Sequence, residues 1–600
     1  MLGVLSLARR MCYTNLMKHY SVREKYTEKA KKPLAEFHPL LIDLLLARGV
    51  TTREQADIFL KPDYIRDMHD PFLLKDMKKA VERILKAIDE KEKIIIYSDY
   101  DHDGVPGAVI LHDFFKKIGY QNFENYIPHR HEEGFGFHKE AVKEFAKNGV
   151  KLVITIDCGI ADVVATACAE DLGINVIITD HHLVPTPAPS ALVIINPKQT
   201  DCQYPEKMLC GSGVIFKVVQ ALALSLSTFD FRHTTISPIP MGWEKWLLDM
   251  AGIATLSDMV PLVGENRALA YYGLAVLRKS PRVGLQALLN VTKIDQRYVS
   301  EDDIGFMIAP RINAASRMGI PYDAFKLFAT TDLTEAGALA THLDAKNTER
   351  KGVVAGMVKD IKKHVSQRYG DEVSPKLIVM GNPDWRPALL GLIASNIVEA
   401  FSCPVFLWGR EAEAEGILKG SCRSYGSMHM LDLMHATPVG TFLQFGGHAF
   451  AAGFSFAQEK VHLLEESLLA GLSQIKQSDK SEIIAVDAEL EIDHVSWTTY
   501  REVEKLAPFG TGNPKPLFIF KNVLIKNIKV FGKQKNHLEI GFENSTGKSV
   551  KAIGFFMTAD TWGKELVSGE FIDLVATFEK SHFRNFPELR LRVVDVLRNK

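Results

Sequence analysis

The chain has 600 residues, 46% of them hydrophobic and 24% charged, with a formal net charge of −1. This length is too great for a single hydrophobic core, so we expect roughly three or four domains. The nearly neutral charge excludes nucleic-acid binding through the global field and leaves only local basic patches for it. No apolar run approaches the roughly 18 residues that span a bilayer, so no membrane is expected as a partner. Seven cysteines without a CxxC pair indicate reduced thiols in a cytoplasmic protein.

The N-terminal region is basic at first and then helical in pattern. The first twenty residues contain Arg9, Arg10 and Lys18 but no acid. MLGVLSLA is too short and too poorly flanked for a signal peptide, so we expect a plain cytoplasmic N-terminus, with a weak amphipathic presequence as the alternative. Between residues 39 and 88, apolar residues recur at spacings of three and four, which predicts helices.

The next part of the chain alternates between strands and helices. Short apolar runs, KIIIYSDYD, VKLVITIDCG, INVIITDHH and SALVIINP, are typical of buried strands. The amphipathic segments GAVILHDFFKKIG and ADVVATACAEDLG lie between them. This alternation predicts βαβ units and a parallel, doubly wound sheet.

The remaining chain predicts a connecting helix, a second α/β lobe and a barrel. A long, charged, proline-free segment is followed by PKLIVMG and then by the polar linker QSDKSE at residues 477–482. Short alternating runs after the linker predict an all-β barrel of about five strands. The predicted domains are a helical extension, a parallel-sheet catalytic lobe, a connecting helix, a second lobe and a barrel, at residues 1–80, 81–333, 334–370, 371–476 and 483–600.

Three carboxylates follow the first predicted strand, in the stretch SDYDHDG. Asp99, Asp101 and Asp103 are close enough to repel one another unless a cation lies between them. The pattern matches the opening of an EF-hand loop, but the twelfth loop position is Ile110 instead of a glutamate, and the run follows a strand instead of a helix. What remains is a carboxylate cluster at the carboxyl end of a strand, where open α/β sheets place their active sites.

Other potential ligands follow the next strands. Asp157 ends VITID. Asp180 ends VIITD and is followed by His181 and His182. Asp258 follows an apolar helix in ATLSDMVPL. The carboxyl ends of parallel strands meet at one sheet edge, so these groups can converge there. Oxygen-rich ligands with one or two imidazoles and no thiolate favour Mg²⁺ or Mn²⁺, and several bridging carboxylates favour a pair of ions that hydrolyses phosphodiesters. Asp180 has an alternative role, which is to orient a histidine.

These residues carry a resemblance to a known family. DYDHDG, TIDCG, TDHH and LSDMVPL, in that order, resemble the motifs of the DHH phosphoesterase superfamily, and more specifically of the RecJ single-stranded-DNA exonucleases. The resemblance extends over nearly the whole chain, through LCGSGVIFK, APRINAASRMG, GSCRS, GGHAFAAG and FGTGNPKPLF. It implies a DHH lobe with a parallel sheet, a DHH-associated second α/β lobe, a long helix joining them and an OB-type barrel.

The resemblance also implies an activity and a set of site residues. The activity is 5′→3′ degradation of single-stranded DNA to mononucleotides with two Mn²⁺ or Mg²⁺ ions, in DNA repair and recombination. The matching metal positions are Asp101, Asp103, Asp157, His181 and Asp258. Asp99 matches a nearby acidic position and is counted with them as a candidate metal ligand, and His182 matches a histidine close to the scissile phosphate. Ser421 and Arg423 resemble the pair that receives the 5′ end, and Arg317 resembles another phosphate contact. His448 either hydrogen-bonds a phosphate or supports its turn.

The predicted barrel contains a separate indication of strand binding. From residue 521 to residue 537 there are five lysines and no acid. Phe520 directly precedes this stretch, Phe531 lies within it, and Arg584, Arg590 and Arg592 follow later. Cationic grooves with aromatic platforms hold single strands on OB-type barrels, so Lys529 and Lys533 are candidate contacts. The alternative is a solvated, lysine-rich strand face.

Three alternative functions fit the sequence less well. A DHH phosphodiesterase for cyclic dinucleotides or short RNA would not need the barrel or the N-terminal helices. A metal-dependent pyrophosphatase would be expected to lack the third domain. A non-catalytic replication scaffold would be expected to lose metal carboxylates that this chain keeps. For the exonuclease, the resemblance makes a single-strand-binding protein and a helicase reasonable partners.

Overall fold

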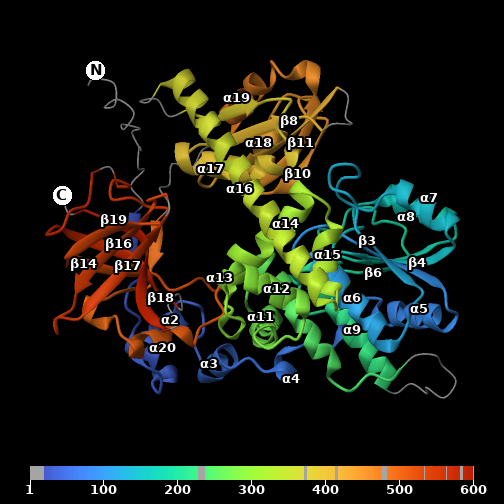
Figure 1. The fold of residues 1–600 in the computed structure, drawn as a ribbon, viewed down its shortest axis with the longest axis horizontal. Coiled ribbons are helices and arrows are strands. Elements are labelled where there is room, and N and C mark those ends of the chain that lie inside the picture. Colours follow the sequence, from blue (N-terminus) through green and yellow to red (C-terminus); the bar gives the residue numbers. More distant parts are fainter. Residues whose placement is uncertain are drawn as a thin grey trace. The chain divides into compact units, whose positions relative to one another are not determined.

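The computed structural model describes residues 19–227, 237–370, 375–411, 416–475, 483–532, 534–562, 564–581 and 586–598 (Figure 1). Contacts divide the chain into two compact units. One comprises residues 58–351 and 507–514, and the other comprises the described residues up to 57 with 352–506 and 515–600. Arg9, Arg10, Lys18, the linker 477–482, Lys533 and Arg584 lie outside the described residues. Among the described helices, none has the length and apolar content needed to cross a membrane.

The first unit is built on the predicted parallel sheet. Its strand order is β3-β2-β4-β5-β6, with every neighbouring pair parallel. The strands are β2 (Lys93–Ser98), β3 (Phe123–Tyr126), β4 (Val150–Ile156), β5 (Asn175–Thr179) and β6 (Val193–Ile195). The edge strand β3 was not predicted, because FENY lacks the apolar run that marks the others.

Both faces of this sheet are covered, as the near-continuous apolar strands require. Ile94 and Ile96 of β2 pack into a core with α5 (Met77–Asp89), α6 (Gly104–Ile118) and α9 (Gly211–Ser227). Ile95 and Tyr97 point to the opposite face and pack with α7 (Lys139–Lys147) and α8 (Val163–Asp171). Alternate residues of one strand therefore serve two cores.

The strand order reverses beside β2, and this places the candidate site. The chain passes from β2 to β3 on one side and returns to β4 on the other, which is the switch point where open α/β sheets bind ligands. The hydrogen-bond ladder extends one residue beyond three strands, because Asp99, Asp157 and Asp180 donate their N–H groups to Ile156, Thr179 and Ile195. These bonds hold the backbones of the three aspartates in register at one edge.

The rest of this unit is helical. Its helices are α10 (Leu248–Ser257), α11 (Gly264–Leu277), α12 (Val283–Thr292), α14 (Ala309–Met318), α15 (Tyr322–Ala329) and the first half of α16 (Leu333–Tyr369). Helices α10 and α11 approach closely at two glycines, because a Cβ on Gly252 would lie 2.6 Å from the Cα of Gly273. Asp258 follows α10 directly. The long α16 agrees with the predicted connecting helix.

The second unit contains two larger sheets. The first has the order β10-β11-β9-β8-β7 and carries α17 (Pro387–Phe401), α18 (Met430–His435) and α19 (Leu464–Gln474). Its strands are β7 (Ile378–Gly381), β8 (Val405–Gly409), β9 (Ile417–Arg423), β10 (Gln444–His448) and β11 (Ala451–Ala457). Only β7 and β8 are parallel. This sheet is the predicted second α/β lobe.

The other sheet of this unit has seven strands in the order β13-β14-β18-β19-β17-β16-β15. They are β13 (Ala488–Glu489), β14 (Phe518–Leu524), β15 (Asn527–Phe531), β16 (His537–Glu543), β17 (Ser549–Phe555), β18 (Phe571–Ser581) and β19 (Glu588–Leu597). The prediction of about five strands was too low, partly because FIFKNVLIKNIKVFG folds as two strands instead of one. Asn522 has a φ of +50° at an irregularity in β14, and the chain turns after Leu524.

The N-terminal segment contributes to the second unit. β1 (His19–Val22) pairs in parallel with β12 (Ile483–Val486). It is followed by α2 (Pro39–Leu46) and by α3 (Arg53–Leu60), whose last three residues belong to the first unit. Phe520, predicted as an aromatic platform among the lysines, is fully buried in β14, so this prediction was wrong. Its place in the strand alternation directs the ring into the core.

Candidate active site

The turn between β2 and α6 is shaped by its three aspartates. The Asp101 carboxylate accepts hydrogen bonds from the N–H groups of Asp103 and Gly104, at 2.8 and 3.2 Å. Burial opposes ionisation, but the charge of His102 and these N–H groups hold the pKa of Asp101 below its usual value. Gly104 is required because a Cβ there would lie 2.4 Å from the carbonyl oxygen of Asp99.

The Asp103 carboxylate is held by the N-terminus of α9. It accepts hydrogen bonds from the N–H groups of Gly211 (2.6 Å) and Ser212 (2.7 Å), and Ser212 Oγ donates to the Asp103 carbonyl. A helix N-terminus offers unpaired N–H groups and a positive dipole end, both of which stabilise a buried carboxylate. This explains how a side chain that is 1% exposed is held in one orientation.

Asp157 lies at the end of β4 in a strained conformation. Its φ is +60°, which a non-glycine residue adopts at a cost of about 1 kcal/mol or more. Burial and the charges of Asp103, Asp101 and Asp99 raise its pKa well above the usual value. Such strain and charge repulsion are typical of functional sites.

Asp180, His181 and His182 form a connected turn after β5. Asp180 is fully buried and accepts hydrogen bonds from the N–H groups of both histidines and from His182 Nδ1, the last at 2.8 Å. Burial lowers the pKa of His182, but the hydrogen bond and charge of Asp180 outweigh it, so that the pKa is raised. The geometry matches the alternative in which Asp180 orients a histidine.

His181 lies among three of the predicted carboxylates. Its Nε2 is 3.2 Å from Asp157 Oδ1 and 3.7 Å from Asp103 Oδ2, and its Nδ1 is 3.9 Å from Asp258 Oδ2. Burial lowers the pKa of His181, which favours the neutral imidazole that binds metals. Burial and the charges of Asp103 and Asp101 raise the pKa of Asp258 to about 9.

These side chains fit a divalent-metal centre. Three overlapping groups have ligand atoms within 4.8 Å of one another: Asp157, His181 and His182; Asp103, His181 and Asp258; Asp99, Asp101 and Asp157. Asp99 Oδ1 and Asp157 Oδ1 are buried and accept no hydrogen bond from any described residue. Buried carboxylate oxygens without donors need a cation or a proton. The oxygen-rich donor set matches Mn²⁺ or Mg²⁺.

Arg317 belongs to a group of cations beside this centre. Burial and the charges of Arg130 and Arg350 lower its pKa to about 9, while Asp101 raises it. Arg130 lies over the ring of Tyr100 at 4.8 Å. A group of guanidinium ions beside carboxylates is suited to phosphate oxygens.

The remaining predicted residues lie in the second unit. Arg423 Nη1 donates to Ser421 Oγ at 3.0 Å on β9, and a Cβ on Gly391 would lie 2.6 Å from Arg423 Nη2. His448 ends β10 and is exposed, and Lys529 is exposed on β15. Lys533 lies outside the described residues.

Sequence reasoning did not assign roles to several residues of the site. Gly211 and Ser212 stand in the motif LCGSGVIFK, where two glycines before an apolar helix could have indicated an anion-binding helix start. Asn313, in APRINAASRMG, accepts a hydrogen bond from the His102 N–H at 3.1 Å. Arg130 follows β3 in IPHR, and a strand end was the available signal.

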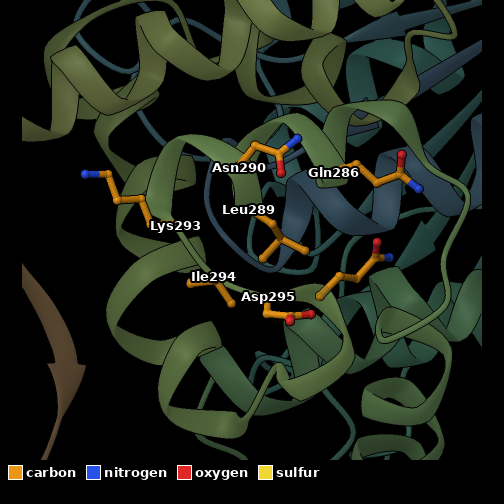
Figure 2. A pocket seen from close by; sticks show the side chains of 7 residues that line it. Gln286, Leu289, Asn290, Lys293, Ile294 and Asp295 are labelled. Carbon is orange, nitrogen blue, oxygen red and sulfur yellow. The ribbon is translucent and has the colours of Figure 1, made fainter. Parts of the chain in front are cut away.

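A pocket in the first unit has a different set of lining residues. It is lined by α12 and the turn after it, with Gln286, Leu289, Asn290, Lys293, Ile294, Asp295 and Gln296 around it (Figure 2). None of the proposed ligands lines this pocket, and its walls carry neither a carboxylate cluster nor an imidazole. The metal centre is therefore the better candidate for catalysis.

Three family models match successive parts of the chain. The model of the DHH family, N-terminal domain, matches residues 93–243, the DHHA1 domain matches residues 374–475, and the RecJ OB domain matches residues 486–595. The predicted parallel-sheet lobe, second lobe and OB-type barrel are confirmed by these matches and by the observed sheets. The predicted domain boundaries stay a prediction.

Curated proteins and solved structures agree with these matches. The single-stranded-DNA-specific exonuclease RecJ of Bacillus subtilis (strain 168) is 33% identical, over 96% of this chain and 70% of that protein. The RecJ of Salmonella typhimurium is 31% identical, over 96% and 98%. Crystal structures of RecJ from Thermus thermophilus with Mn²⁺ and with Mg²⁺ have TM-scores of 0.78 and 0.72 and identities of 25% and 24%; both cover 97% of this chain, and the matches cover 80% and 79% of those chains. The chain therefore belongs to the RecJ family of single-stranded-DNA-specific exonucleases.

Proposed function

We propose that this protein is a metal-dependent exonuclease that degrades single-stranded DNA in the 5′→3′ direction and releases mononucleotides. The observation that carries this proposal is the convergence of five carboxylates and two imidazoles at the switch point of the parallel sheet. The RecJ relatives are named as exonucleases specific for single-stranded DNA. Their name supports the substrate class, and the family resemblance supports the polarity.

The proposed ligands divide naturally between two ions. Asp99, Asp101 and Asp157 form one group, and Asp103, His181 and Asp258 form another. Mn²⁺ or Mg²⁺ bound there would lower the pKa of water to generate the nucleophile and would stabilise charge on the leaving oxygen. The chain's own contribution is to hold the carboxylates oriented at one edge of the sheet, with Asp101 and Asp103 fixed by backbone N–H groups.

His182 is suited to move a proton beside the scissile phosphate. Asp180 accepts the hydrogen bond of its Nδ1 and raises its pKa, so that a larger share of His182 is protonated at neutral pH. The half-exposed ring can then hydrogen-bond a phosphate oxygen or protonate the departing 3′ oxygen. Asp180 contributes by fixing the orientation of the imidazole.

Basic side chains would position the strand. Arg317 lies beside Asp101 and is suited to grip a phosphate near the cleavage point. Ser421 and Arg423, paired on β9, are proposed to receive the 5′ phosphate, and His448 is a further phosphate donor. Lys529, which is exposed on the barrel, is proposed to contact the phosphate backbone of the strand.

The test uses purified protein, Mn²⁺ and a single-stranded oligonucleotide labelled at either end. Early release of the 5′ label as a mononucleotide is the expected result, and the Asp157→Ala variant should release none. If the protein binds the strand but releases neither label, the exonuclease proposal is wrong. Early release of the 3′ label would contradict the polarity alone.

The partners and the compartment are also proposed. From the family resemblance, we infer that a helicase unwinds the duplex, that a single-strand-binding protein delivers the strand, and that the protein acts in the cytoplasm during repair and recombination. Co-purification of the tagged chain from cells with DNA damage, after nuclease treatment of the lysate, would test the partners. Recovery of neither protein would contradict this inference.

A further inference from the structure

The loop that follows β3 is held rigidly. The Glu133 carboxylate accepts hydrogen bonds from the Tyr126 hydroxyl and from the His129 N–H, both at 2.6 Å. The buried Tyr97 hydroxyl donates to the carbonyl oxygen of Gly136 at 2.9 Å. Buried and partly buried hydrogen bonds at both ends of the loop fix its course.

The glycine in this loop allows a close approach. Gly136 has a φ of +106°, and a Cβ there would lie 2.7 Å from Asp162 Oδ1. The other oxygen of Asp162 accepts a hydrogen bond from the Phe137 N–H at 2.8 Å. The backbone on either side of residue 135 is therefore tightly constrained, and so is the position from which its side chain projects.

This constrained loop presents an exposed aromatic ring beside the metal centre. Phe135 is 54% exposed. Its ring centroid lies 6.1 Å from that of His182 and 6.5 Å from that of Tyr100, both in edge-to-face geometry. Tyr100 is 5% exposed and lies beneath the guanidinium of Arg130 at 4.8 Å, so Phe135 presents the accessible aromatic face of this group.

An exposed phenylalanine by itself needs no explanation, since apolar atoms make up much of any protein surface. The position of Phe135 is different, because it combines a fixed backbone, an edge contact with the proposed proton-transfer histidine and a neighbouring phosphate-binding cation. A nucleotide bound with its phosphate at His182 carries its base within one sugar's length of that point. An aromatic ring at that place offers a stacking surface.

We propose that Phe135 is a stacking platform for a nucleobase next to the scissile phosphate. This inference rests on the proposed exonuclease function and adds a base subsite to it. Stacking on an aromatic ring is tolerant of sequence, because every base has a π-face. The subsite would therefore orient each successive nucleotide for cleavage without restricting which base is removed.

The test is a cycle between residue and base. Single-turnover rates with Mn²⁺ are measured for the wild type and for Phe135→Leu, on oligonucleotides that are intact or that carry one abasic nucleotide at the first or second position. If Phe135 stacks on a base, the single-turnover rate of the wild type should be about tenfold lower when the abasic nucleotide is at one of these two positions than on the intact strand. The single-turnover rate of Phe135→Leu should be about tenfold below that of the wild type on the intact strand, and it should fall no further on the abasic strand. Phe135→Tyr should restore the rate, and Phe72→Leu, a change at another half-exposed phenylalanine, should leave it unaltered.

Three outcomes would overturn the proposal. The first is an equal rate of the wild type on abasic and intact strands. The second is that Phe135→Leu and the abasic site lower the rate independently, so that their combined effect is the product of the two. The third is a loss of rate in Phe135→Tyr as large as that in Phe135→Leu.

A binding measurement separates this subsite from the exonuclease proposal. The Asp157→Ala variant is mixed with a strand that carries 2-aminopurine at its first or second position. Stacking on Phe135 should quench the fluorescence, and adding Phe135→Leu should restore most of it. Quenching without cleavage by the wild type would refute the exonuclease and keep the platform. Cleavage with unchanged fluorescence in both variants would keep the exonuclease and refute the platform.

Discussion

A methyl group added at Gly211 should disable the metal centre without touching a proposed ligand chemically. In Gly211→Ala the new Cβ would lie 2.5 Å from Asp157 Cβ, 2.7 Å from Oδ1 and 2.8 Å from Cγ. Gly211 cannot retreat, because its N–H donates to Asp103 and it begins α9. Asp157 cannot retreat either, because its backbone N–H is bound to Thr179.

The expected size of the effect follows from these distances. Ordinary carbon contacts are about 3.5 Å, so the side chain of Asp157 must move by about 1 Å. A misplacement of about 1 Å in a catalytic group costs about 10²-fold in rate. A comparable disturbance of a metal site costs about 10- to 100-fold in metal affinity. Crowding of a packed interior costs a further ~1–3 kcal/mol of stability.

The assay compares nuclease rate, Mn²⁺ affinity and melting temperature between Gly211→Ala and Gly213→Ala. Gly213 lies in the same helix, but a Cβ there would meet nothing closer than Cys210 Sγ at 3.5 Å. Gly213→Ala should therefore keep its rate and gain up to ~1 kcal/mol of stability from higher helix propensity. If Gly211→Ala binds Mn²⁺ and cleaves as the wild type does, the placement of Asp157 beside α9 is wrong.

Three other changes have defined outcomes. The pKa of Asp258 is about 9 in the metal-free fold and 3.8 ordinarily. Between these two pH values the folded chain keeps a proton on Asp258 that the unfolded chain loses, so the metal-free protein loses stability as the pH rises from 3.8 to about 9. Mn²⁺ must displace the proton on Asp258, so Mn²⁺ should raise the melting temperature more at about pH 8.5 than at about pH 6. An equal rise at both pH values would contradict the raised pKa of Asp258. Lys217→Met leaves the fully buried Glu265 without its ammonium partner, so the free energy of unfolding measured in urea should fall by about 3–5 kcal/mol. Adding Glu265→Gln should recover most of this loss. If the losses from the two substitutions are additive, the two residues do not form a buried ion pair. Phe520→Ala, at a fully buried side chain, should lower the free energy of unfolding by about 3–5 kcal/mol. Phe556→Ala, at a side chain that is 82% exposed, should lower it by less than about 0.5 kcal/mol. The reverse order in urea unfolding would contradict the observed register of the barrel.

The sequence predicts the sheet and its acidic edge because both depend on local patterns. Buried parallel strands are apolar runs, and a carboxylate after such a run lies at the carboxyl edge, so Asp99, Asp157 and Asp180 could be placed together in advance. The edge strand β3 could not, because FENY carries no such signal. The direction of Phe520 could not be read either, because the alternation within a strand depends on where the strand begins.

Contacts between distant segments are the part that local patterns miss. The motif LCGSGVIFK is recognisable, but that its first amides hold Asp103 depends on how α9 packs against α6. In the same way, Phe135 reads as one aromatic residue in a glycine-rich loop. The proposed role of Phe135 depends on its contacts with the rings of His182 and Tyr100, which come from two other loops.

The acidic cluster explains why these distant contacts are needed. Asp99, Asp103 and Asp157 are each less than 5% exposed. Burial and the charge of Asp101 raise the pKa of Asp99, and burial and the charges of Asp103, Asp101 and Asp99 raise the pKa of Asp157. Without compensation, such groups would take up protons and lose their value as ligands. The N-terminus of α9 compensates Asp103, and the amides after it compensate Asp101, whereas the buried oxygens on Asp99 and Asp157 are left without donors. The fold thus neutralises part of the charge and leaves the rest for divalent cations, so that metal binding completes the electrostatic balance of the sheet edge.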